Sequence, residues 1–318
     1  MKKLFLFLLV VGGVVVAVSV YLYTKDYGSY FHAKKGTLGS TTTTEAGGDS
    51  LFTKSWLTQM NDQGFAVNCG MLVPKKGSGP YPAIIVLGGK ATGKYAVDYA
   101  INIKEVIVVA VDYPYEARPS YTLLQFAQDV PAIRTALLDM VPSVMLLTDY
   151  LWQRKDVDTT KVVLLGYSFG APLVPAVLAH DKRAAVAALV YGGGDLRSLI
   201  THNVRRYEGY LTSEAVGLLG GLLLRPLEPL RYIGSVTPKP LIMINGLQDE
   251  QIPRRNARIL YDAASEPKKL IWLESMHVRT ENVELTRKIV GTLTRELAAI
   301  GILDSMTLPT IPIQDGRE

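Results

Sequence analysis

The sequence has a single cysteine, Cys69, and only four histidines among its 318 residues. One cysteine excludes an internal disulfide and gives no information on the redox compartment. Cys69 lies in the strand-like segment 65–74, where a small buried hydrophobe is the expected role rather than a nucleophile. No group of histidines, cysteines and carboxylates has the spacing of metal ligands, so we expect neither a metal nor another cofactor.

The chain also lacks a dense run of basic residues. Lysine and arginine exceed aspartate and glutamate by 34 to 29, but they are scattered and are not interleaved with aromatic residues. This distribution is typical of a mildly basic, solvated surface and gives no support to nucleic-acid binding. Apolar residues make up 48% of the chain, which is typical of a globular protein.

Charge is absent from residues 4–23, an apolar run that follows Lys2 and Lys3. The run is long enough to cross a bilayer as a helix and longer than the apolar part of most signal peptides. Residues 1–25 are therefore predicted to be a retained membrane anchor, with the folded domain outside the cytoplasm. The alternative is a signal peptide cleaved near Ser19, followed by release into the periplasm or secretion.

Residues 26–50 have no apolar periodicity and are rich in glycine, serine and threonine, so they are predicted to be a flexible stalk. The folded domain is expected at 51–303, with 304–318 as a C-terminal tail. Two β-rich segments, 51–57 and 65–73, flank the turn signal NDQG and predict an antiparallel hairpin.

Beyond Pro82, short apolar strands alternate with longer helical patterns. Strands that are apolar at nearly every position belong to a sheet covered on both faces, which indicates parallel strands joined by helices. A long apolar pattern at 121–153 contains Pro131 and Pro142, so we expect its helix to be kinked or split. The expected strands are 83–87, 106–111, 161–165, 185–191, 241–245 and 269–273.

Residues 196–238 interrupt this alternation. They contain the apolar, glycine-rich stretch SEAVGLLGGLLL, which is too short to span a membrane. The segment is predicted to be a small insertion, either a helix that packs on the domain or a cap over a pocket that admits an apolar acyl group.

The motif GYSFG, Gly166 to Gly170, lies between the apolar strand 161–165 and an apolar, helix-like run. Ser168 is therefore expected at a strand-to-helix turn, where flanking glycines avoid collisions with neighbouring backbone. The N–H groups at the start of the helix would offer hydrogen bonds and a positive dipole to an oxyanion.

A nucleophilic serine needs a base within hydrogen-bond reach and an acid that orients the base. Of the four histidines, His277 follows a strand of the predicted sheet, at the carboxyl edge where active sites lie. Asp249 lies in the loop after an earlier strand, which gives the chain order Ser, Asp, His. Asp195 is an alternative acid, and Glu250 is a near competitor that is expected to point elsewhere.

The oxyanion hole is expected to use two backbone N–H groups. The first belongs to Phe169, directly after the nucleophile. The second is expected from the loop after strand 83–87, where Gly88 and Gly89 permit close backbone approach. Gly89 is the predicted donor and Lys90 the alternative.

Together with the acid loop GLQDEQIP and the histidine segment SMHV, the GYSFG motif resembles the α/β-hydrolase fold, closest to the dienelactone-hydrolase-like serine esterases. The resemblance covers about residues 51–303. It implies an α/β fold with an eight-stranded, mostly parallel sheet flanked by helices, and a serine hydrolase that cleaves a small-molecule acyl ester through an acyl-enzyme on Ser168. The His-Gly-Gly-Gly loop of hormone-sensitive-lipase-like esterases is missing, because Leu87 stands where its histidine would be.

Several alternatives stay open. A peptidase, thioesterase or acyltransferase would use the same nucleophile. GGKATGK at 88–94 and the apolar strand that ends at Asp112 resemble a P-loop nucleotide hydrolase, but Tyr95 stands where a metal-binding serine or threonine is required. A non-catalytic, membrane-tethered binding scaffold would be expected to have lost part of the Ser–Asp–His set, which is intact. The sequence does not indicate an oligomeric state.

Overall fold

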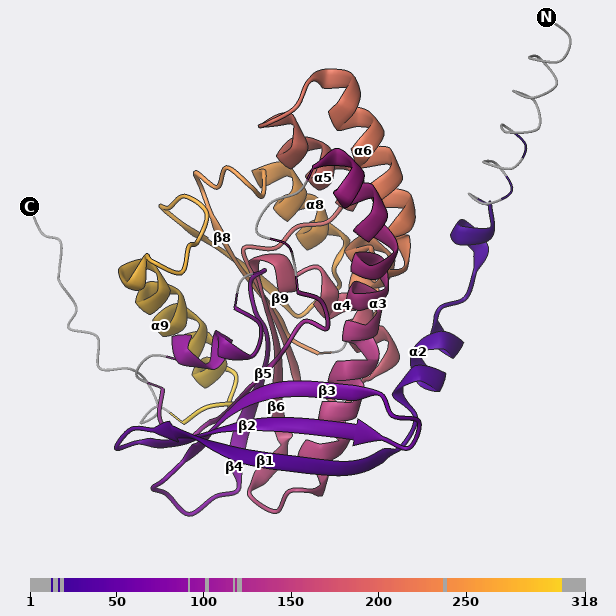
Figure 1. The fold of residues 1–318 in the computed structure, drawn as a ribbon. Coiled ribbons are helices and arrows are strands. Elements are labelled where there is room, and N and C mark those ends of the chain that lie inside the picture. The colour runs from indigo at the N-terminus through magenta and orange to yellow at the C-terminus, as the bar shows by residue number, and fades with distance from the viewer. Residues whose placement is uncertain are drawn as a thin grey trace, which may run out of the picture.

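The computed structural model describes residues 20–304, together with Gly13 and Ala17, except for 91, 101–102, 117, 119–121 and 237–238. In this part of the chain one mixed sheet of nine strands runs in the order β1-β2-β3-β5-β4-β6-β7-β8-β9 (Figure 1). The pairs β1-β2, β2-β3 and β3-β5 are antiparallel, and the remaining pairs are parallel. The strands are β1 (Leu38–Gly48), β2 (Phe52–Asn61), β3 (Ala66–Pro74), β4 (Tyr81–Leu87), β5 (Ile107–Val111), β6 (Val157–Tyr167), β7 (Val186–Val190), β8 (Leu241–Gly246) and β9 (Lys268–Leu273).

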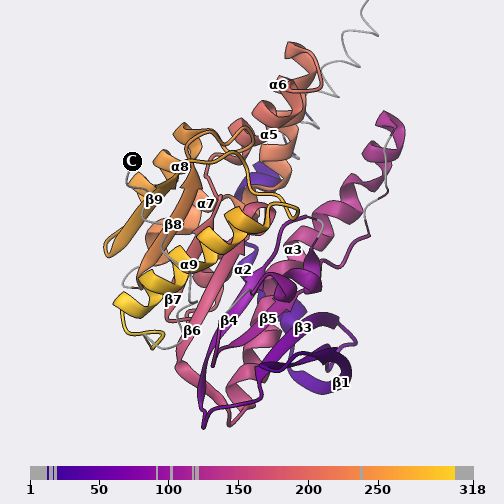
Figure 2. The same cartoon turned by 90° about the vertical axis from the view of Figure 1, so that its left-hand side faces the viewer.

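Helices cover both faces of this sheet. Figure 1 shows α3 and α9 on opposite sides, and Figure 2 shows α9 lying across the parallel strands. The α-helices are α2 (Gly28–Lys35), α3 (Leu123–Gln153), α4 (Leu173–His180), α5 (Leu196–Arg205), α6 (Tyr210–Leu223), α7 (Pro229–Tyr232), α8 (Arg254–Ala263) and α9 (Val283–Ala299). Short 3₁₀ turns are η1 (Gly93–Tyr99), η2 (Ser168–Gly170), η3 (Arg225–Leu227) and η4 (Ile233–Val236).

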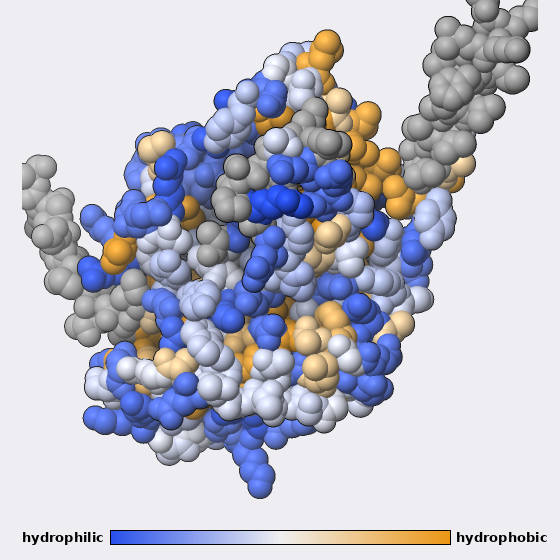
Figure 3. Space-filling model, viewed as in Figure 1, coloured by the Kyte–Doolittle hydropathy of each residue, from blue (hydrophilic) through white to orange (hydrophobic). Residues whose placement is uncertain are grey.

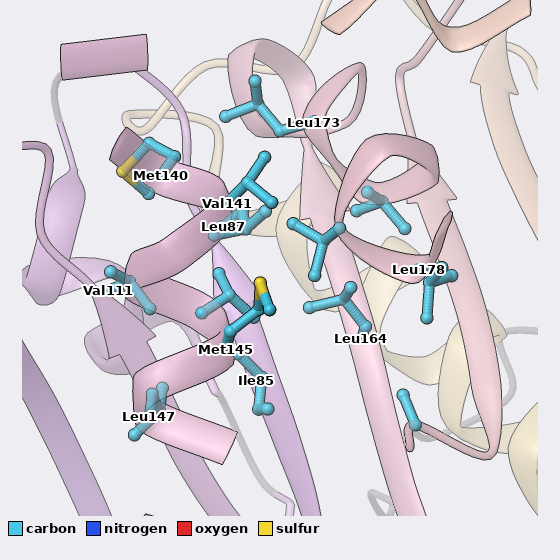
Figure 4. Close-up of a cluster of buried hydrophobic side chains, with 14 of the residues drawn as sticks. Ile85, Leu87, Val111, Met140, Val141, Met145, Leu147, Leu164, Leu173 and Leu178 are labelled. Atoms are coloured by element: carbon cyan, nitrogen blue, oxygen red, sulfur yellow. The ribbon is translucent and has the colours of Figure 1, made fainter. Parts of the chain in front are cut away.

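Each central strand contributes side chains to two cores, because successive residues of a strand point to opposite faces. Ile85 and Leu87 of β4 pack with α3 and α4, in the cluster drawn in Figure 4. Ile84 and Val86 pack in a second core with α9. This explains why β4 is apolar at almost every position and confirms the predicted sheet with two covered faces.

The helix predicted at 121–153 is not split. α3 runs without a break through Pro131 and Pro142. Two side chains bond to backbone carbonyls near the prolines, Thr135 to Pro131 at 2.9 Å and Ser143 to Asp139 at 2.7 Å. Among the described helices only α3 is long and apolar enough to cross a membrane, and most of it is buried inside the protein.

Residues 26–50 are not the predicted flexible stalk. They form α2 and β1, and β1 pairs with β2 along its length. Phe31 of α2 is fully buried and packs edge-on against His180, with 4.9 Å between the ring centroids. The composition was misleading because β1 is an edge strand whose side chains are mostly exposed, so it lacks apolar alternation, while its β-branched threonines favour a strand. This strand makes the sheet nine-stranded rather than eight-stranded.

The predicted membrane segment, residues 4–23, lies mostly outside the described residues. Of its C-terminal part, residues 20–23 are helical, and Val20, Tyr21 and Tyr23 are exposed.

We expect Phe31→Ala to lower the free energy of unfolding by about 3–5 kcal/mol, since it removes a fully buried aromatic ring. Chemical denaturation of the full chain measures the change. Phe126→Ala on α3 is the matched control, because Phe126 is 41% exposed. Equal effects of the two substitutions would show that α2 does not contribute to the folded domain.

Candidate active site

Ser168 lies at a sharp turn between β6 and α4. Its φ is +53°, in the left-handed region that residues other than glycine rarely adopt. A side chain at Gly166 would collide with Ala171, and one at Gly170 would overlap the carbonyl of Leu87 in β4. The glycines therefore let the turn pack directly on the neighbouring strand, and the predicted strand-to-helix turn is confirmed.

A continuous chain of hydrogen bonds joins Ser168, His277 and Asp249. The hydroxyl Oγ of Ser168 is 2.7 Å from Nε2 of His277, and Nδ1 of His277 is 2.9 Å from each carboxylate oxygen of Asp249. The side chains of His277 and Asp249 are buried. Oδ1 of Asp249 also accepts hydrogen bonds from the N–H groups of Gln251 and Ile252, at 2.8 and 2.9 Å. These bonds hold the carboxylate in the orientation that the imidazole needs.

Two residues that the sequence did not indicate as supports, Glu250 and Tyr191, contact the histidine loop. Oε2 of Glu250 accepts the backbone N–H of His277 at 3.0 Å, and Oε1 accepts Arg279 at 3.1 Å. The ring of Tyr191 meets that of His277 edge-on at 5.5 Å, and its hydroxyl bonds to Ser275. As expected, Glu250 is not the acid that bonds to the imidazole of His277. Its carboxylate instead accepts the backbone N–H of His277 and so fixes the loop.

Burial alone would raise the pKa of Glu250, but hydrogen bonds from the backbone N–H groups of His277 and of Glu250 itself, with Arg279, lower it from 4.5 to about 2. A lowered pKa means that the carboxylate stabilises the fold above pH 4.5 and that this contribution disappears as the pH falls toward 2. Sequence analysis assigned Glu250 no such role.

We therefore expect Glu250→Gln to be less stable than the unmodified chain at pH 7. The difference should shrink below about pH 4.5, because protonation then removes the same charge. Urea unfolding between pH 7 and 3 measures this, with the exposed Glu45→Gln as control. A stability difference that does not change with pH would contradict the assignment.

The alternative acid, Asp195, has another role. It caps α5 by accepting the N–H of Ser198 at 3.1 Å, and its φ of +61° is left-handed. Asp249, not Asp195, is hydrogen-bonded to His277.

The prediction of Gly89 as an oxyanion donor is not supported by its position. Gly89 borders a separate apolar cavity of about 80 Å³ between β4, η1 and α9, whereas Lys90 borders the pocket that contains Ser168. The carbonyl of Gly89 closes a turn by accepting the N–H and the hydroxyl of Thr92, both at 3.0 Å. Because of this turn, the next residue is the one on the pocket wall. Phe169 borders the same pocket, as expected.

The P-loop interpretation does not fit the structure. The lysine that would contact phosphates, Lys94, lies in η1 and is 3.6 Å from the carboxylate of Asp112. Asp112 is the residue that would hold magnesium. The two charges thus neutralise each other beside the ring of Trp56.

The pocket beside Ser168 has a volume of about 430 Å³, within the range of small-molecule sites. Ser168, Phe169 and His277 form one side. Most other lining side chains are apolar, with Lys90, Asn203 and Gln251 as polar exceptions. The insertion 196–238 forms the opposite wall through Leu196, Leu199, Ile200, Val204, Leu224 and Leu227.

Helix α5 of this wall is tied to the acid loop. Nε2 of His202 lies 3.0 Å from the carbonyl of Glu250, and the amide of Asn203 donates to the carbonyl of Gln251 at 2.9 Å. These carbonyls immediately follow Asp249 in the chain. The wall of the pocket and the acid of the site therefore share one hydrogen-bonded unit.

Comparisons with known proteins match parts of this chain to hydrolase families. Residues 139–281 match the prolyl oligopeptidase family, and this stretch includes Ser168, Asp249 and His277. The uncharacterised protein YfhR of Escherichia coli O157:H7 is 31% identical over 119 residues, which are 37% of this chain and 38% of YfhR. The α/β hydrolase domain-containing protein WAV2 of Arabidopsis thaliana is 27% identical over 122 residues, which are 37% of this chain and 39% of WAV2. The chain thus aligns with less than half the length of these relatives.

Two solved structures share the fold. An acetyl xylan esterase from Paenibacillus sp. R4 superposes with a TM-score of 0.62 at 14% identity, covering 86% of this chain and 93% of the esterase. Acetyl xylan esterase 1 from Thermoanaerobacterium sp. JW/SL YS485 gives 0.59 at 16% identity, covering 84% and 93%. The sheet and these superpositions show the α/β-hydrolase fold, and the match of residues 139–281 supports a serine-type hydrolase in general. The chain thus has the α/β-hydrolase fold; the dienelactone-hydrolase-like branch stays a prediction.

Proposed function

We propose that the chain is a serine hydrolase that cleaves a carboxylic ester through an acyl-enzyme on Ser168. The observation that carries this proposal is the unbroken hydrogen-bond chain from Asp249 through His277 to Ser168, which ends at a mostly apolar pocket. A hydroxyl with a base at 2.7 Å and a buried acid behind the base has the three parts that an activated nucleophile needs.

The reaction begins when Oγ of Ser168 attacks the acyl carbonyl and Nε2 of His277 takes the hydroxyl proton. Negative charge develops on the carbonyl oxygen, where the backbone N–H groups of Phe169 and Lys90 are the proposed donors. His277 then gives its proton to the leaving alkoxide, which departs as an alcohol. Water, deprotonated by His277, attacks the acyl-enzyme and releases a carboxylic acid, and Ser168 regains its proton.

The pocket favours an apolar acyl group. The leucine and isoleucine side chains of the insertion line its wall opposite Ser168, and burying an alkyl chain there contributes about 0.8 kcal/mol per methylene. The side-chain amide of Asn203 donates to the carbonyls of Leu199 and Gln251, so its oxygen is the part that can still accept a bond. The side-chain amide of Gln251 also borders the pocket and can bond to a polar part of the ester.

A peptidase is the second candidate, and the match of residues 139–281 to the prolyl oligopeptidase family favours it. The same nucleophile would then form an acyl-enzyme from an amide, and His277 would protonate an amine. A thioesterase or an acyltransferase would also use this nucleophile, whereas a binding scaffold would not use it at all.

We also propose that residues 1–25 anchor the chain in a membrane with the catalytic domain outside the cytoplasm; secretion or a periplasmic location after signal cleavage is the alternative. The uncharged run 4–23 supports the anchor. Val20, Tyr21 and Tyr23, which form part of this run, are exposed apolar residues.

Labelling with a fluorophosphonate tests the proposed nucleophile. The unmodified chain should gain one adduct, located on Ser168 by peptide mapping, and Ser168→Ala and His277→Ala should gain none. A panel of esters, thioesters and peptide amides then separates the candidate substrates by kcat/KM. A folded protein without an adduct would favour the scaffold.

A further inference from the structure

Helix α6 carries its apolar residues on the wrong side for a surface helix. Its outward stripe contains Leu211, Leu218 and Leu219, which are 81%, 56% and 55% exposed. Ser213 and Gly217 on the opposite side are buried. Helices on a globular surface normally direct their apolar stripe inward and polar residues outward.

Close packing against α5 explains the inward side. A side chain at Gly217 would overlap the hydroxyl of Thr201, and one at Gly221 would collide with Arg197. Small residues allow two helices to approach closely, and leucines on this side would force them apart. The packing of α6 therefore accounts for its glycines, but it leaves the outward leucines without a partner among the described residues.

The leucine stripe is part of a larger exposed apolar surface. Tyr207 and Tyr210 are exposed at the N-terminal end of α6. At its C-terminal end, Arg225 stacks on the ring of Tyr23, with 3.3 Å between the guanidinium carbon and the ring centroid. Figure 3 shows this apolar surface along α6, reaching the described end of the N-terminal segment. We call Leu211, Leu218, Leu219, Tyr207 and Tyr210 the α6 face.

Basic residues border the α6 face and stack on its tyrosines. Arg205 lies over the ring of Tyr210 at 4.6 Å, and Arg206 over that of Tyr207 at 5.7 Å. Aromatic residues beside basic ones, with leucines between them, are typical of helices that lie in the boundary of a bilayer. Arg205 is also ion-paired with Glu214 at 2.6 Å, so Arg206 is the one of the two arginines that matches the negative surface of membranes with anionic lipids.

We infer that the α6 face docks on the surface of a lipid bilayer, beside the N-terminal segment. The bilayer is favoured as occupant because the uncharged run 4–23 leads to Tyr23, and Tyr23 is held at the end of α6 by Arg225. Leu224, the residue that follows α6, lines the pocket of Ser168. The docked surface and the pocket wall thus meet at one end of α6, which favours esters dissolved in the lipid phase. The docking inference rests on the proposed anchor. Its consequence for the substrate rests in addition on the proposed ester hydrolysis.

A fluorescent probe on α6 tests the inference in the full chain. Leu218→Cys is labelled with the environment-sensitive dye NBD, and the natural Cys69 stays unlabelled because it is fully buried. The protein is reconstituted into vesicles of phosphatidylcholine and phosphatidylglycerol, with or without spin-labelled lipid. Docking predicts quenching of about two-fold or more at position 218. Thr43→Cys, at an exposed site on the edge strand β1, should show no quenching.

Flotation of the vesicles separates two kinds of failure. A protein that does not float with the vesicles overturns both the anchor and the docking inference. A protein that floats but is equally unquenched at positions 218 and 43 overturns the docking inference alone. Efficient disulfide cross-linking of unlabelled Leu218→Cys would identify a second copy of the chain as the occupant and would also overturn it.

The charged double variant Leu218→Glu/Leu219→Glu gives a functional test. Neither residue lines the pocket, so hydrolysis of a soluble short-chain ester should stay unchanged. Hydrolysis of a long-chain ester dispersed in the vesicles should fall several-fold, about ten-fold if docking sets substrate delivery. Equal rates of the variant and the unmodified chain on the vesicle substrate would contradict the inference.

Discussion

Replacing Ser168 with alanine is expected to lower kcat/KM for ester hydrolysis by about 10⁴-fold or more. The substitution removes the hydroxyl that lies 2.7 Å from His277 but keeps the Cβ atom, so the turn should fold as before. Steady-state kinetics with a chromogenic ester measures the loss, and circular dichroism and thermal unfolding check the fold.

Ser235→Ala is the matched control, because Ser235 is exposed on η4, where its hydroxyl donates to the nearby carbonyl of Tyr232. It should keep full activity. If Ser168→Ala kept a rate close to that of the control, the acyl-enzyme mechanism would have to be abandoned.

Asp249→Asn is expected to lower kcat by about 10⁴-fold with a small change in KM. The carboxylate accepts bonds from His277, Gln251 and Ile252, and an amide cannot reproduce this set because one of its two ends is a donor. The imidazole would then adopt the wrong tautomer and lose its ability to take the serine proton. The substrate pocket is not altered, so binding should change little.

Asp195→Asn tests whether this effect is specific to the acid loop. Asparagine also caps helices and tolerates left-handed backbone, so the capping role of Asp195 should survive. Its activity should stay within a few-fold of the unmodified chain. A large loss at Asp195 and a small one at Asp249 would reverse the assignment of the acid.

The parallel half of the sheet and the turn at Ser168 could be predicted because their signals are local. The strands β5 and β7 are apolar and buried at every position, and Gly170 marks where the turn touches β4. The juxtaposition of Asp249 and His277 followed from a general rule, since both lie beyond the carboxyl ends of parallel strands. Their hydrogen-bonded geometry agrees with the sequence analysis, and their catalytic role stays a prediction.

The sequence analysis failed where the structure depends on strand pairing or hydrogen bonds that composition does not reveal. β1 was taken for a stalk because an exposed edge strand has no apolar face that a pattern could reveal. The second oxyanion donor stays a prediction: Gly89 was preferred to Lys90 because glycine permits close approach, whereas Lys90 is the one of the two that borders the pocket of Ser168. Glu250 holds the loop of His277 through a backbone N–H, a contact that no residue pattern encodes.

The two bonds between α5 and the acid loop constrain how this protein can admit and release ligands. Any outward swing of α5 must break the bonds of His202 and Asn203 to the carbonyls of Glu250 and Gln251. The two peptide groups that follow Asp249 then lose these hydrogen bonds to α5. The same peptide groups donate their N–H groups to the Asp249 carboxylate and orient it. A movement that widens the pocket at α5 would therefore also remove bonds that hold the peptides around the Asp249 carboxylate.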